Sequence, residues 1–399
     1  MRLGTSSIVV AAFVGPGTVL TCASAGVRFG YTLGWVLVFS TFAVFVLQSF
    51  TAGTGILAQK GIGEAVRDRA STLVQRIWMY GLIILGLGIG CAAFETGNLA
   101  GASAGIQILS GAEEASSWYI VLVAAVAGVL LLLDVKRLIN VLAVFVAGMG
   151  VVFVASVVLA PIAWAELLRG LIVPSAPEGS ILTVIALVGT TIVTYTLFLH
   201  PGACKAYWAG TDSDRAWKGE LTGMALFIPL GGIVSLCILF SGAAVQGIGE
   251  NISSVPAFAT LLEPVAGPAA RIVLGVGLCA AGITSAVTAP LAASIGISEL
   301  FGWDQNEHVG FKAVWMIVLI SGLLFNLTGI SPLQLIIAAQ AANGVLLPLI
   351  AGFVLYLTWT QKAVDIPLWY KGIGVVVVGI CGFLGLRTLR WVFDMIVGG

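Results

Sequence analysis

Gly15-Pro16-Gly17-Thr18 interrupts the first apolar segment of the chain, which runs over residues 6–27. Proline has no backbone N–H for the helical hydrogen-bond ladder, and glycine leaves helical geometry at little cost. The stretch therefore predicts about one unwound turn in the middle of an apolar helix. The freed backbone groups need partners that lipid does not supply. The break indicates either a binding site or a proline kink that neighbouring helices shield.

The composition predicts a polytopic helical membrane protein. Of 399 residues, 59% are hydrophobic and 9% are charged, which is more apolar surface than a soluble core can bury. The formal net charge is zero, so nothing favours a nucleic-acid partner. The six cysteines fall in or beside apolar segments without a Cys-x-x-Cys pair, and we interpret them as packing residues, with no disulfide frame and no metal site.

Eleven apolar segments of roughly 20 residues or more follow one another along the chain. They cover residues 6–27, 31–59, 73–109, 118–135, 139–163, 181–204, 219–246, 268–298, 311–328, 333–358 and 370–391. Thirteen of the eighteen Lys and Arg residues fall on the side that carries the N-terminus. Because such an excess is typical of the cytoplasmic side, we expect an integral protein of the cell or inner membrane with a cytoplasmic N-terminus and an external C-terminus.

A second interruption is predicted in the sixth segment, where Gly189 to Thr196 gather β-branched and hydroxyl side chains. It begins about 175 residues after Gly15, and matched breaks in two halves are typical of inverted-repeat secondary transporters with a midplane site. We expect residues 1–165 and 166–360 to form two five-helix repeats, followed by a linker and an eleventh helix in 361–399. The alternative is polar helix-packing residues without a break.

Several stretches resemble the natural-resistance-associated macrophage protein (NRAMP) family of metal transporters. Val10 to Asp68 is similar to its first two spans, residues 168–200 to its entry into span six, and Leu278–Leu291 and Pro332–Pro348 to spans eight and ten. The resemblance implies an all-α polytopic LeuT-like fold of two inverted five-helix repeats plus an eleventh transmembrane helix. It also implies that spans one and six are unwound at the substrate.

The chain departs from the family where the metal is held. Gly15-Pro16-Gly17-Thr18 stands where the family has Asp-Pro-Gly-Asn, and Val193-Thr194-Tyr195 stands where it has Met-Pro-His. The family's carboxylate, amide and thioether ligands are thus replaced. A divalent ion leaving water needs a full set of oxygen or softer ligands and usually a negative charge. We therefore expect the metal site to be lost.

The preferred hypothesis is a secondary transporter of a small organic solute that works by alternating access. Half-helix N-termini would hold the carboxylate of an amino acid or another small acid or zwitterion. The alternative is a divalent metal ion such as Mn²⁺ or Mg²⁺, as in the parent family. The predicted substrate-binding residues are Gly15, Pro16, Gly17, Thr18, Thr190, Thr191, Val193, Thr194, Tyr195, Gln340 and Asn343.

Polar residues inside other segments are candidates for coupling transport to an ion gradient. Glu95 and Asn98 stand where the family has two carboxylates, and His200 matches a family histidine. A carboxyl group at membrane depth costs roughly 2.5–3.5 kcal/mol and usually faces the bundle interior. We expect H⁺ as the coupling ion, with Na⁺ at Thr284 and Ser285 as the alternative, and no cofactor. A structural role for Glu95 and His200 stays open, as does the oligomeric state.

An enzyme is not expected, because His200 and His308 are the only histidines and no paired carboxylates stand in the apolar segments. A channel is the other alternative. Two interrupted helices favour alternating access over an open pore.

Overall fold

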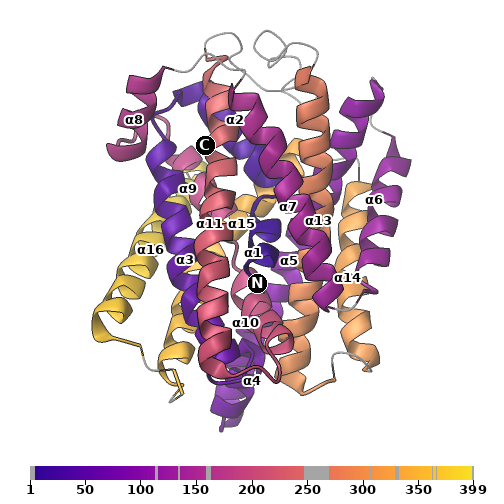
Figure 1. Ribbon diagram of the computed structural model, residues 1–399, viewed down its shortest axis with the longest axis vertical. Helices are drawn as coiled ribbons and strands as arrows, with labels where there is room; N and C mark the ends of the chain where they lie inside the picture. The colour runs from indigo at the N-terminus through magenta and orange to yellow at the C-terminus, as the bar shows by residue number, and fades with distance from the viewer. Residues whose placement is uncertain are drawn as a thin grey trace.

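The computed structural model describes residues 5–112, 116–133, 135–158, 163–246, 269–304, 308–328, 332–361, 363–364 and 366–397. The described chain folds into helices joined by short connections (Figure 1). Their bounds are α1 Ser6–Phe13, α2 Pro16–Phe29, α3 Gly34–Ile56, α4 Ile62–Arg69, α5 Leu73–Ser110, α6 Ser117–Leu130, α7 Val135–Val158, α8 Trp164–Ile172, α9 Ile181–Thr191, α10 Thr196–Tyr207, α11 Ser213–Ala243, α13 Ala269–Phe301, α14 Val309–Asn326, α15 Pro332–Trp359 and α16 Leu368–Val397.

Every predicted apolar segment contains a helix or a pair of consecutive helices. The first segment is the pair α1 and α2, and the sixth is the pair α9 and α10. Within the described residues, seven helices are long and apolar enough to cross a membrane, and the bent pair α1 and α2 adds an eighth. The short helices α4 and α8 were not predicted, because each is too short to give a long apolar run. Two residues used in the orientation prediction, Arg2 and Lys362, lie outside the described part.

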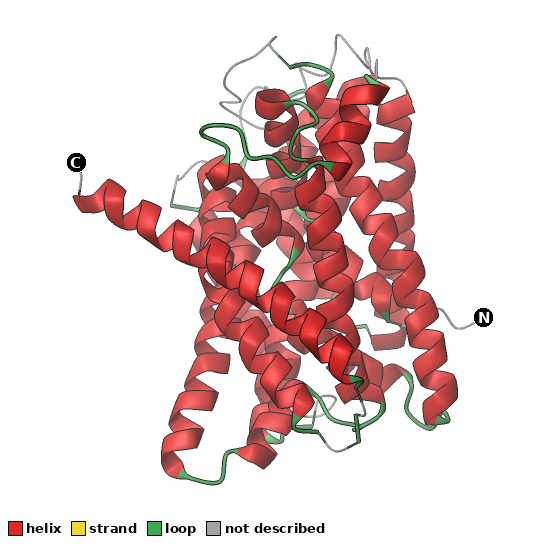
Figure 2. Cartoon of the chain, turned by 90° about the vertical axis from the view of Figure 1, so that its left-hand side faces the viewer, coloured by secondary structure: helices red, strands yellow, loops and turns green. Residues whose placement is uncertain are grey.

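The long helices form an upright bundle with α4 at one end and α8 at the other, and these ends are named the α4 end and the α8 end (Figure 1). α1 lies in the middle of the bundle, where it contacts α7, α10, α11 and α13. The last helix, α16, runs obliquely across the outside (Figure 2) and packs on α15. The broken helix α1/α2 is therefore surrounded by protein, as an irregular backbone at membrane depth requires.

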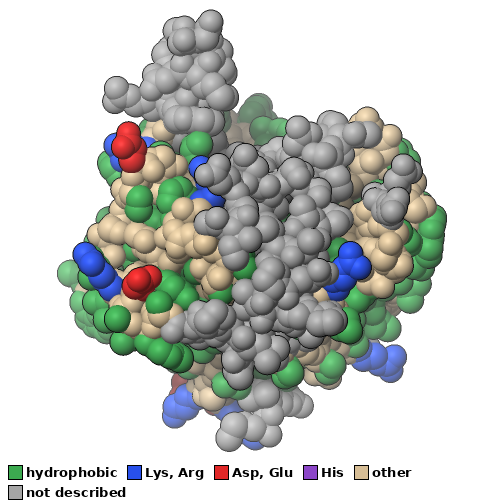
Figure 3. All heavy atoms as spheres, turned by 90° about the horizontal axis from the view of Figure 1, so that it is seen from above, with side chains coloured by type: hydrophobic (Ala, Val, Ile, Leu, Met, Phe, Trp, Pro, Cys, Tyr) green, Lys and Arg blue, Asp and Glu red, His purple; other side chains and the backbone are tan. Residues whose placement is uncertain are grey.

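The outside of the bundle is apolar, which fits a lipid environment. Large hydrophobic side chains such as Trp78, Ile317 and Phe383 are more than half exposed. Viewed from the α8 end, hydrophobic side chains form much of the rim, and charged side chains are scattered (Figure 3). The chain is thus an integral membrane protein with the all-α fold that the sequence predicts.

Glycines allow the inner helices to approach closely. A Cβ atom on Gly105 of α5 would come within 2.7 Å of the Gly275 carbonyl oxygen of α13, and one on Gly282 would collide with Ala102. Small residues at such contacts are how membrane helices gain packing energy without a hydrophobic driving force. The α5–α13 contact supplies a rigid wall behind the first break.

Candidate functional site

The first predicted break is confirmed. α1 ends at Phe13 and α2 begins at Pro16, with a bend of 57° between them. Gly15 precedes α2 in an extended conformation, with φ −97° and ψ −179°, and Pro16 occupies the first turn of the helix. Proline is well suited to that place because the first N–H groups of a helix have no partner in the helix.

Hydroxyl groups from three other places satisfy the carbonyl groups that the first break leaves free. Ser285 Oγ of α13 donates to the carbonyl oxygens of Ala11 and Ala12, at 3.2 and 3.3 Å. The Tyr195 hydroxyl also reaches Ala12 O, at 3.4 Å, and Thr18 Oγ1 donates to the carbonyl oxygen of Phe13. The end of α1 is therefore a set of buried carbonyl oxygens that side-chain hydroxyls cover.

The second predicted break is also confirmed, between Thr191 and Thr196. Asn343 of α15 holds it from the side: its Oδ1 atom accepts from Thr194 N at 3.3 Å and from Thr194 Oγ1 at 2.8 Å. Its Nδ2 atom donates to the carbonyl oxygens of Gly189, at 2.5 Å, and Ile192, at 3.0 Å. The predicted pair Thr194 and Asn343 is thus in direct contact, but it faces the backbone of its own break.

The two breaks meet at Thr18 and Thr190. Their hydroxyl oxygens are 2.9 Å apart, and Thr18 Oγ1 is 3.4 Å from the carbonyl oxygen of Thr190. Beside them, the Gln340 side chain lies directly against Gly17, where any Cβ atom would overlap its amide nitrogen. Gln340 Oε1 is buried and has no hydrogen-bond partner among the described residues. The oxygens Phe13 O, Thr18 Oγ1, Thr190 O and Thr190 Oγ1, together with the Gln340 amide beside Gly17, are named the break site.

Some predicted site residues lie near the breaks but make other contacts. Thr191 Oγ1 donates to Leu187 O of its own helix at 2.8 Å, and Thr284 Oγ1 donates to Ala281 O of its own helix at 3.0 Å. The carbonyl oxygen of Val193 accepts from Thr196 Oγ1 at 2.7 Å. Gly15 lies against Ser285, because a Cβ atom there would be 2.7 Å from Ser285 Oγ. Pro16 packs on Gly101 of α5.

Tyr195 is among the largest fully buried side chains of the described residues. Its ring packs edge-on against Phe94, with 5.4 Å between the ring centroids. Glu95, the next residue of α5, is fully buried. Within the described residues, neither carboxyl oxygen of Glu95 makes a hydrogen bond of normal geometry, although the Asn98 side chain lies nearby. This buried carboxyl group thus lies one residue from Phe94, whose ring contacts Tyr195 at the second break.

His200 lies away from the break site, in a buried cluster around Glu220 of α11. His200 Nε2 is 3.0 Å from Glu220 Oε1, which also accepts from Ser6 Oγ at 2.7 Å. Glu220 Oε2 accepts from Thr5 N at 2.9 Å and from Trp208 Nε1 at 2.7 Å. A carboxylate is favourable at a helix N-terminus. Through these hydrogen bonds, Glu220 of α11 holds the start of α1 against α10 and α11.

This Glu220 cluster contains the potential metal ligands His200, Cys204 and Glu220, whose ligand atoms lie within 4.8 Å of one another. Cys204 Sγ is 3.1 Å from Thr5 Oγ1. Both oxygens of Glu220 are already occupied by protein donors, so an ion would have to displace the start of α1. Glu220 is thus satisfied by protein donors without a metal, whereas His200 Nδ1 is buried and has no hydrogen-bond partner among the described residues.

Sequence reasoning missed both Glu220 and Glu299. Glu299, near the end of α13, accepts from Gly63 N at 3.1 Å and so binds the first turn of α4. Its backbone carbonyl accepts from Arg67 Nη1 at 2.8 Å. Each glutamate lies within one residue of the end of a predicted apolar segment, where a charge is expected to face water. Each glutamate binds a partner far away in the sequence, and a single sequence does not show such a contact.

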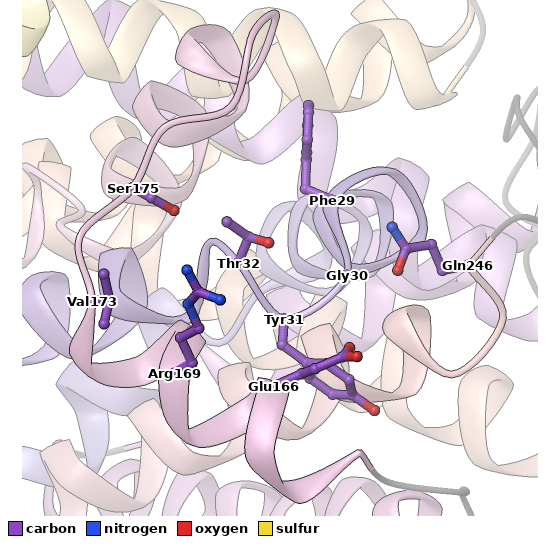
Figure 4. A pocket seen from close by; sticks show the side chains of 10 residues that line it. Phe29, Gly30, Tyr31, Thr32, Glu166, Arg169, Val173, Ser175 and Gln246 are labelled. Atoms are coloured by element: carbon purple, nitrogen blue, oxygen red, sulfur yellow. The ribbon is translucent and has the colours of Figure 1, made fainter.

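A separate cavity of about 490 Å³ lies at the α8 end (Figure 4). Its lining includes Tyr31, Glu166, Arg169 and Gln246. It also includes Phe29, the last residue of α2, which is thirteen residues after Pro16 and so about 20 Å along the helix from the break. This cavity is therefore distinct from the break site.

Comparison with known proteins gives one consistent result. A family model described as natural resistance-associated macrophage protein-like matches residues 6–390. The divalent metal cation transporter MntH of Pectobacterium carotovorum is 24% identical over 401 residues, covering 97% of this chain and 93% of the relative. A manganese transporter of Eremococcus coleocola superposes with a TM-score of 0.81 at 19% identity, covering 100% of this chain and 87% of the other.

A nucleobase-cation-symport-1 family transporter also superposes, with a TM-score of 0.62 at 16% identity over 98% of this chain and 92% of the other. These superpositions confirm the LeuT-like fold that the sequence predicts.

The expectation of an organic solute, including an amino acid, is wrong. The family model and relatives named for a divalent metal cation overturn it. The physical reason is that the prediction considered side-chain ligands and did not include backbone carbonyl oxygens. The breaks free carbonyl groups such as Phe13 O and Thr190 O, which can act as hard ligands. Thr18 and Thr190, and likewise Gln340 and Gly17, also contact one another at the place where an organic carboxylate was expected.

Proposed function

Because the chain belongs to the natural resistance-associated macrophage protein-like family, we propose that it is a divalent metal cation transporter that works by alternating access. The observation that carries the proposal is the break site. Two interrupted helices bring backbone carbonyls, two threonine hydroxyls and one unpartnered amide oxygen to one buried place. Discontinuous helices whose unwound carbonyls coordinate a cation are a recurring design of this kind of transporter.

The spacing of the oxygens suits a small divalent ion. Thr18 Oγ1 lies 2.9 Å from Thr190 Oγ1 and 3.4 Å from Thr190 O. An octahedral shell with metal–oxygen distances of about 2.1 Å has neighbouring oxygens about 3.0 Å apart. A hydroxyl that now donates to a carbonyl can rotate its hydrogen away and present a lone pair to the ion. Binding then replaces hydrogen bonds within the break site by metal–oxygen contacts.

The ligand chemistry favours hard ions. The break site offers neutral oxygens, and the apolar Val193 stands where a thioether ligand is expected from the family resemblance. Oxygen ligands suit Mg²⁺, Ca²⁺ and Mn²⁺, whereas sulfur ligands favour softer metals. A site without its own negative charge binds weakly and leaves water molecules on the ion. The proposed substrate is therefore Mn²⁺ or Mg²⁺, carried partly hydrated.

The proposal includes an orientation of the protein in the membrane and a coupling ion. The excess of Lys and Arg residues supports a cytoplasmic position for the α4 end. Glu95, which is buried and makes no hydrogen bond of normal geometry to the described residues, is the proposed proton carrier, since intramembrane carboxyl groups commonly serve as proton relays. Phe94 and Tyr195 connect its helix to the second break.

Uptake into proteoliposomes tests this function. The purified chain is reconstituted, and uptake of Mn²⁺ is followed with excess Mg²⁺, Cd²⁺ or a mixture of amino acids as competitors. We expect saturable Mn²⁺ uptake that Mg²⁺ inhibits more strongly than Cd²⁺ and that amino acids leave unchanged. Liposomes with Gln340→Leu, which lacks the free amide oxygen, should take up much less. Absence of cation uptake under every imposed gradient would refute the proposal.

A further inference from the structure

We propose that Asn343 is a positioning residue that keeps the second helix broken, in a chain that has no proline at that break. The four hydrogen bonds between Asn343 and the stretch from Gly189 to Thr194 carry the inference. It gives Asn343 a role different from the predicted one of substrate ligand.

The atoms that Asn343 contacts are those that a continuous helix would use. In an uninterrupted ladder, Val193 N would donate to Gly189 O, Thr194 N to Thr190 O, and Thr196 N to Ile192 O. Asn343 Nδ2 occupies Gly189 O and Ile192 O, and Asn343 Oδ1 occupies Thr194 N. Thr196 N bonds instead to Val193 O at 3.2 Å. The Asn343 side chain therefore occupies either the donor or the acceptor of each of these three helical hydrogen bonds.

The ladder would close easily without this obstruction. Residues Ile181–Tyr207 form one apolar span of 27 residues. The described α9 and α10 do not show a bend above 40° between their axes, in contrast to the 57° bend between α1 and α2. The stretch between them contains neither proline nor glycine, the residues that break helices by their own backbone chemistry. Asn343 is 1% exposed, so water does not compete for its hydrogen bonds. The break is thus held by a side chain of another helix.

Closing the ladder would remove an oxygen from the break site. Thr190 O now lies 3.4 Å from Thr18 Oγ1 and faces the first break. In a continuous helix it would accept from Thr194 N instead. This consequence for transport rests on the proposed function, whereas the effect on the helix does not.

Hydrogen–deuterium exchange on the purified protein tests the effect on the helix. Asn343→Leu keeps the side-chain shape and removes both the donor and the acceptor. We expect amides 193–196 to exchange about tenfold more slowly than in the unsubstituted chain, because new ladder bonds protect them. The matched control is Gln340→Leu, which removes a neighbouring buried amide of α15 and should leave exchange at 193–196 unchanged.

A second substitution tests the mechanism by rescue. Thr194→Pro removes the N–H that a closed ladder needs, and its ring would clash with Thr190 O in a continuous helix. The double variant Asn343→Leu/Thr194→Pro should regain the fast exchange at 193, 195 and 196. Mn²⁺ uptake should fall on the order of tenfold to a hundredfold in Asn343→Leu and recover at least partly in the double variant.

The outcomes separate the inference from the proposed function. Unchanged or faster exchange at 193–196 in Asn343→Leu, with a melting temperature close to that of the unsubstituted chain, overturns the inference. Failure of the proline to restore exchange overturns it as well. If Asn343→Leu does not fold, Asn343→Ala is measured in its place against the same expectations. Slowed and rescued exchange in a protein that moves no cation upholds the inference and refutes the proposed function.

Discussion

Thr18 and Thr190 are 172 residues apart in the sequence, and their hydroxyl oxygens lie 2.9 Å apart at the meeting point of two interrupted helices. Thr18 lies in the first turn of α2 and Thr190 in the last turn of α9, so the pair joins the two breaks directly. Thr18 also covers the carbonyl oxygen of Phe13. This pair has no ionised group, and any cation held here would depend on neutral oxygens and on its own retained water.

Thr18→Val should weaken both transport and stability. Valine has the shape of threonine without its hydroxyl group, so Phe13 O and Thr190 Oγ1 lose a buried partner. Leaving a buried polar group unpaired costs about 1–3 kcal/mol, and a lower melting temperature and at least about tenfold slower Mn²⁺ uptake are expected. Thr222→Val is the control, since Thr222 Oγ1 donates to Lys218 O of its own helix on an exposed surface. Equal uptake by the two variants would remove Thr18 from the site.

Gly15 and Ser285 should behave as a coupled pair. A Cβ atom at Gly15 would be 2.7 Å from Ser285 Oγ, so Gly15→Ala forces Ser285 to give up its bonds to Ala11 O and Ala12 O. Each single variant, Gly15→Ala and Ser285→Ala, is expected to lose about 1–2 kcal/mol of unfolding free energy. The double variant should lose clearly less than the sum, because the same hydrogen bonds are removed only once. Additive losses in thermal or denaturant unfolding would show that the contact does not matter.

Glu95→Gln should uncouple metal uptake from the proton gradient. The glutamine side chain has nearly the same shape and cannot change its charge, whereas the buried glutamate can. Mn²⁺ uptake down its own gradient should continue in this variant, and the acceleration by an inward pH gradient should disappear. A variant that keeps the full pH response would clear Glu95 of the role, and Na⁺ in place of the pH gradient would then be the next condition to measure.

The Glu220 cluster should control how often the start of α1 detaches and exposes the buried Cys204 to reagents from the α4 end. Glu220→Gln replaces an acceptor oxygen by an NH₂ group that faces the donors Thr5 N and Trp208 Nε1. Losing a hydrogen bond to a charged group costs about 1.5–3 kcal/mol, so the start of α1 should detach roughly tenfold more often. The buried thiol of Cys204, 3.1 Å from Thr5 Oγ1, reports this opening.

The measurement is the rate of thiol labelling in a variant that retains Cys204 as its sole cysteine. Glu220→Gln should label faster than this background. Asp68→Asn serves as its control, because the Lys60–Asp68 pair lies at the surface and such pairs contribute little. Equal labelling rates in all three proteins would exclude Glu220 as the fastening of α1.

The sequence predicted those features that depend on local chemistry. Pro16 marks the first break by its missing N–H, and the eleven apolar runs mark the helices. It did not predict the role of Asn343, because that role depends on which face of α15 meets the second break. Glu220 was missed for a similar reason: its partner Thr5 lies 215 residues away.

The wrong substrate prediction has a physical cause as well. It counted the side-chain ligands that Gly15 and Val193 had lost, and a side-chain count omits carbonyl oxygens. Which carbonyls are free depends on where each helix ends, and only the folded chain shows that Phe13 O and Thr190 O both lie near Thr18 Oγ1.

An anomalous diffraction map of crystals soaked in Mn²⁺ would test the central claim most directly, because it locates the ion without reference to transport. The account predicts a peak at the break site, within about 2.0–2.6 Å of oxygens of Thr18, Thr190 or Gln340, as hard cations require. A peak at His200, Cys204 and Glu220 with none between the two broken helices would contradict it.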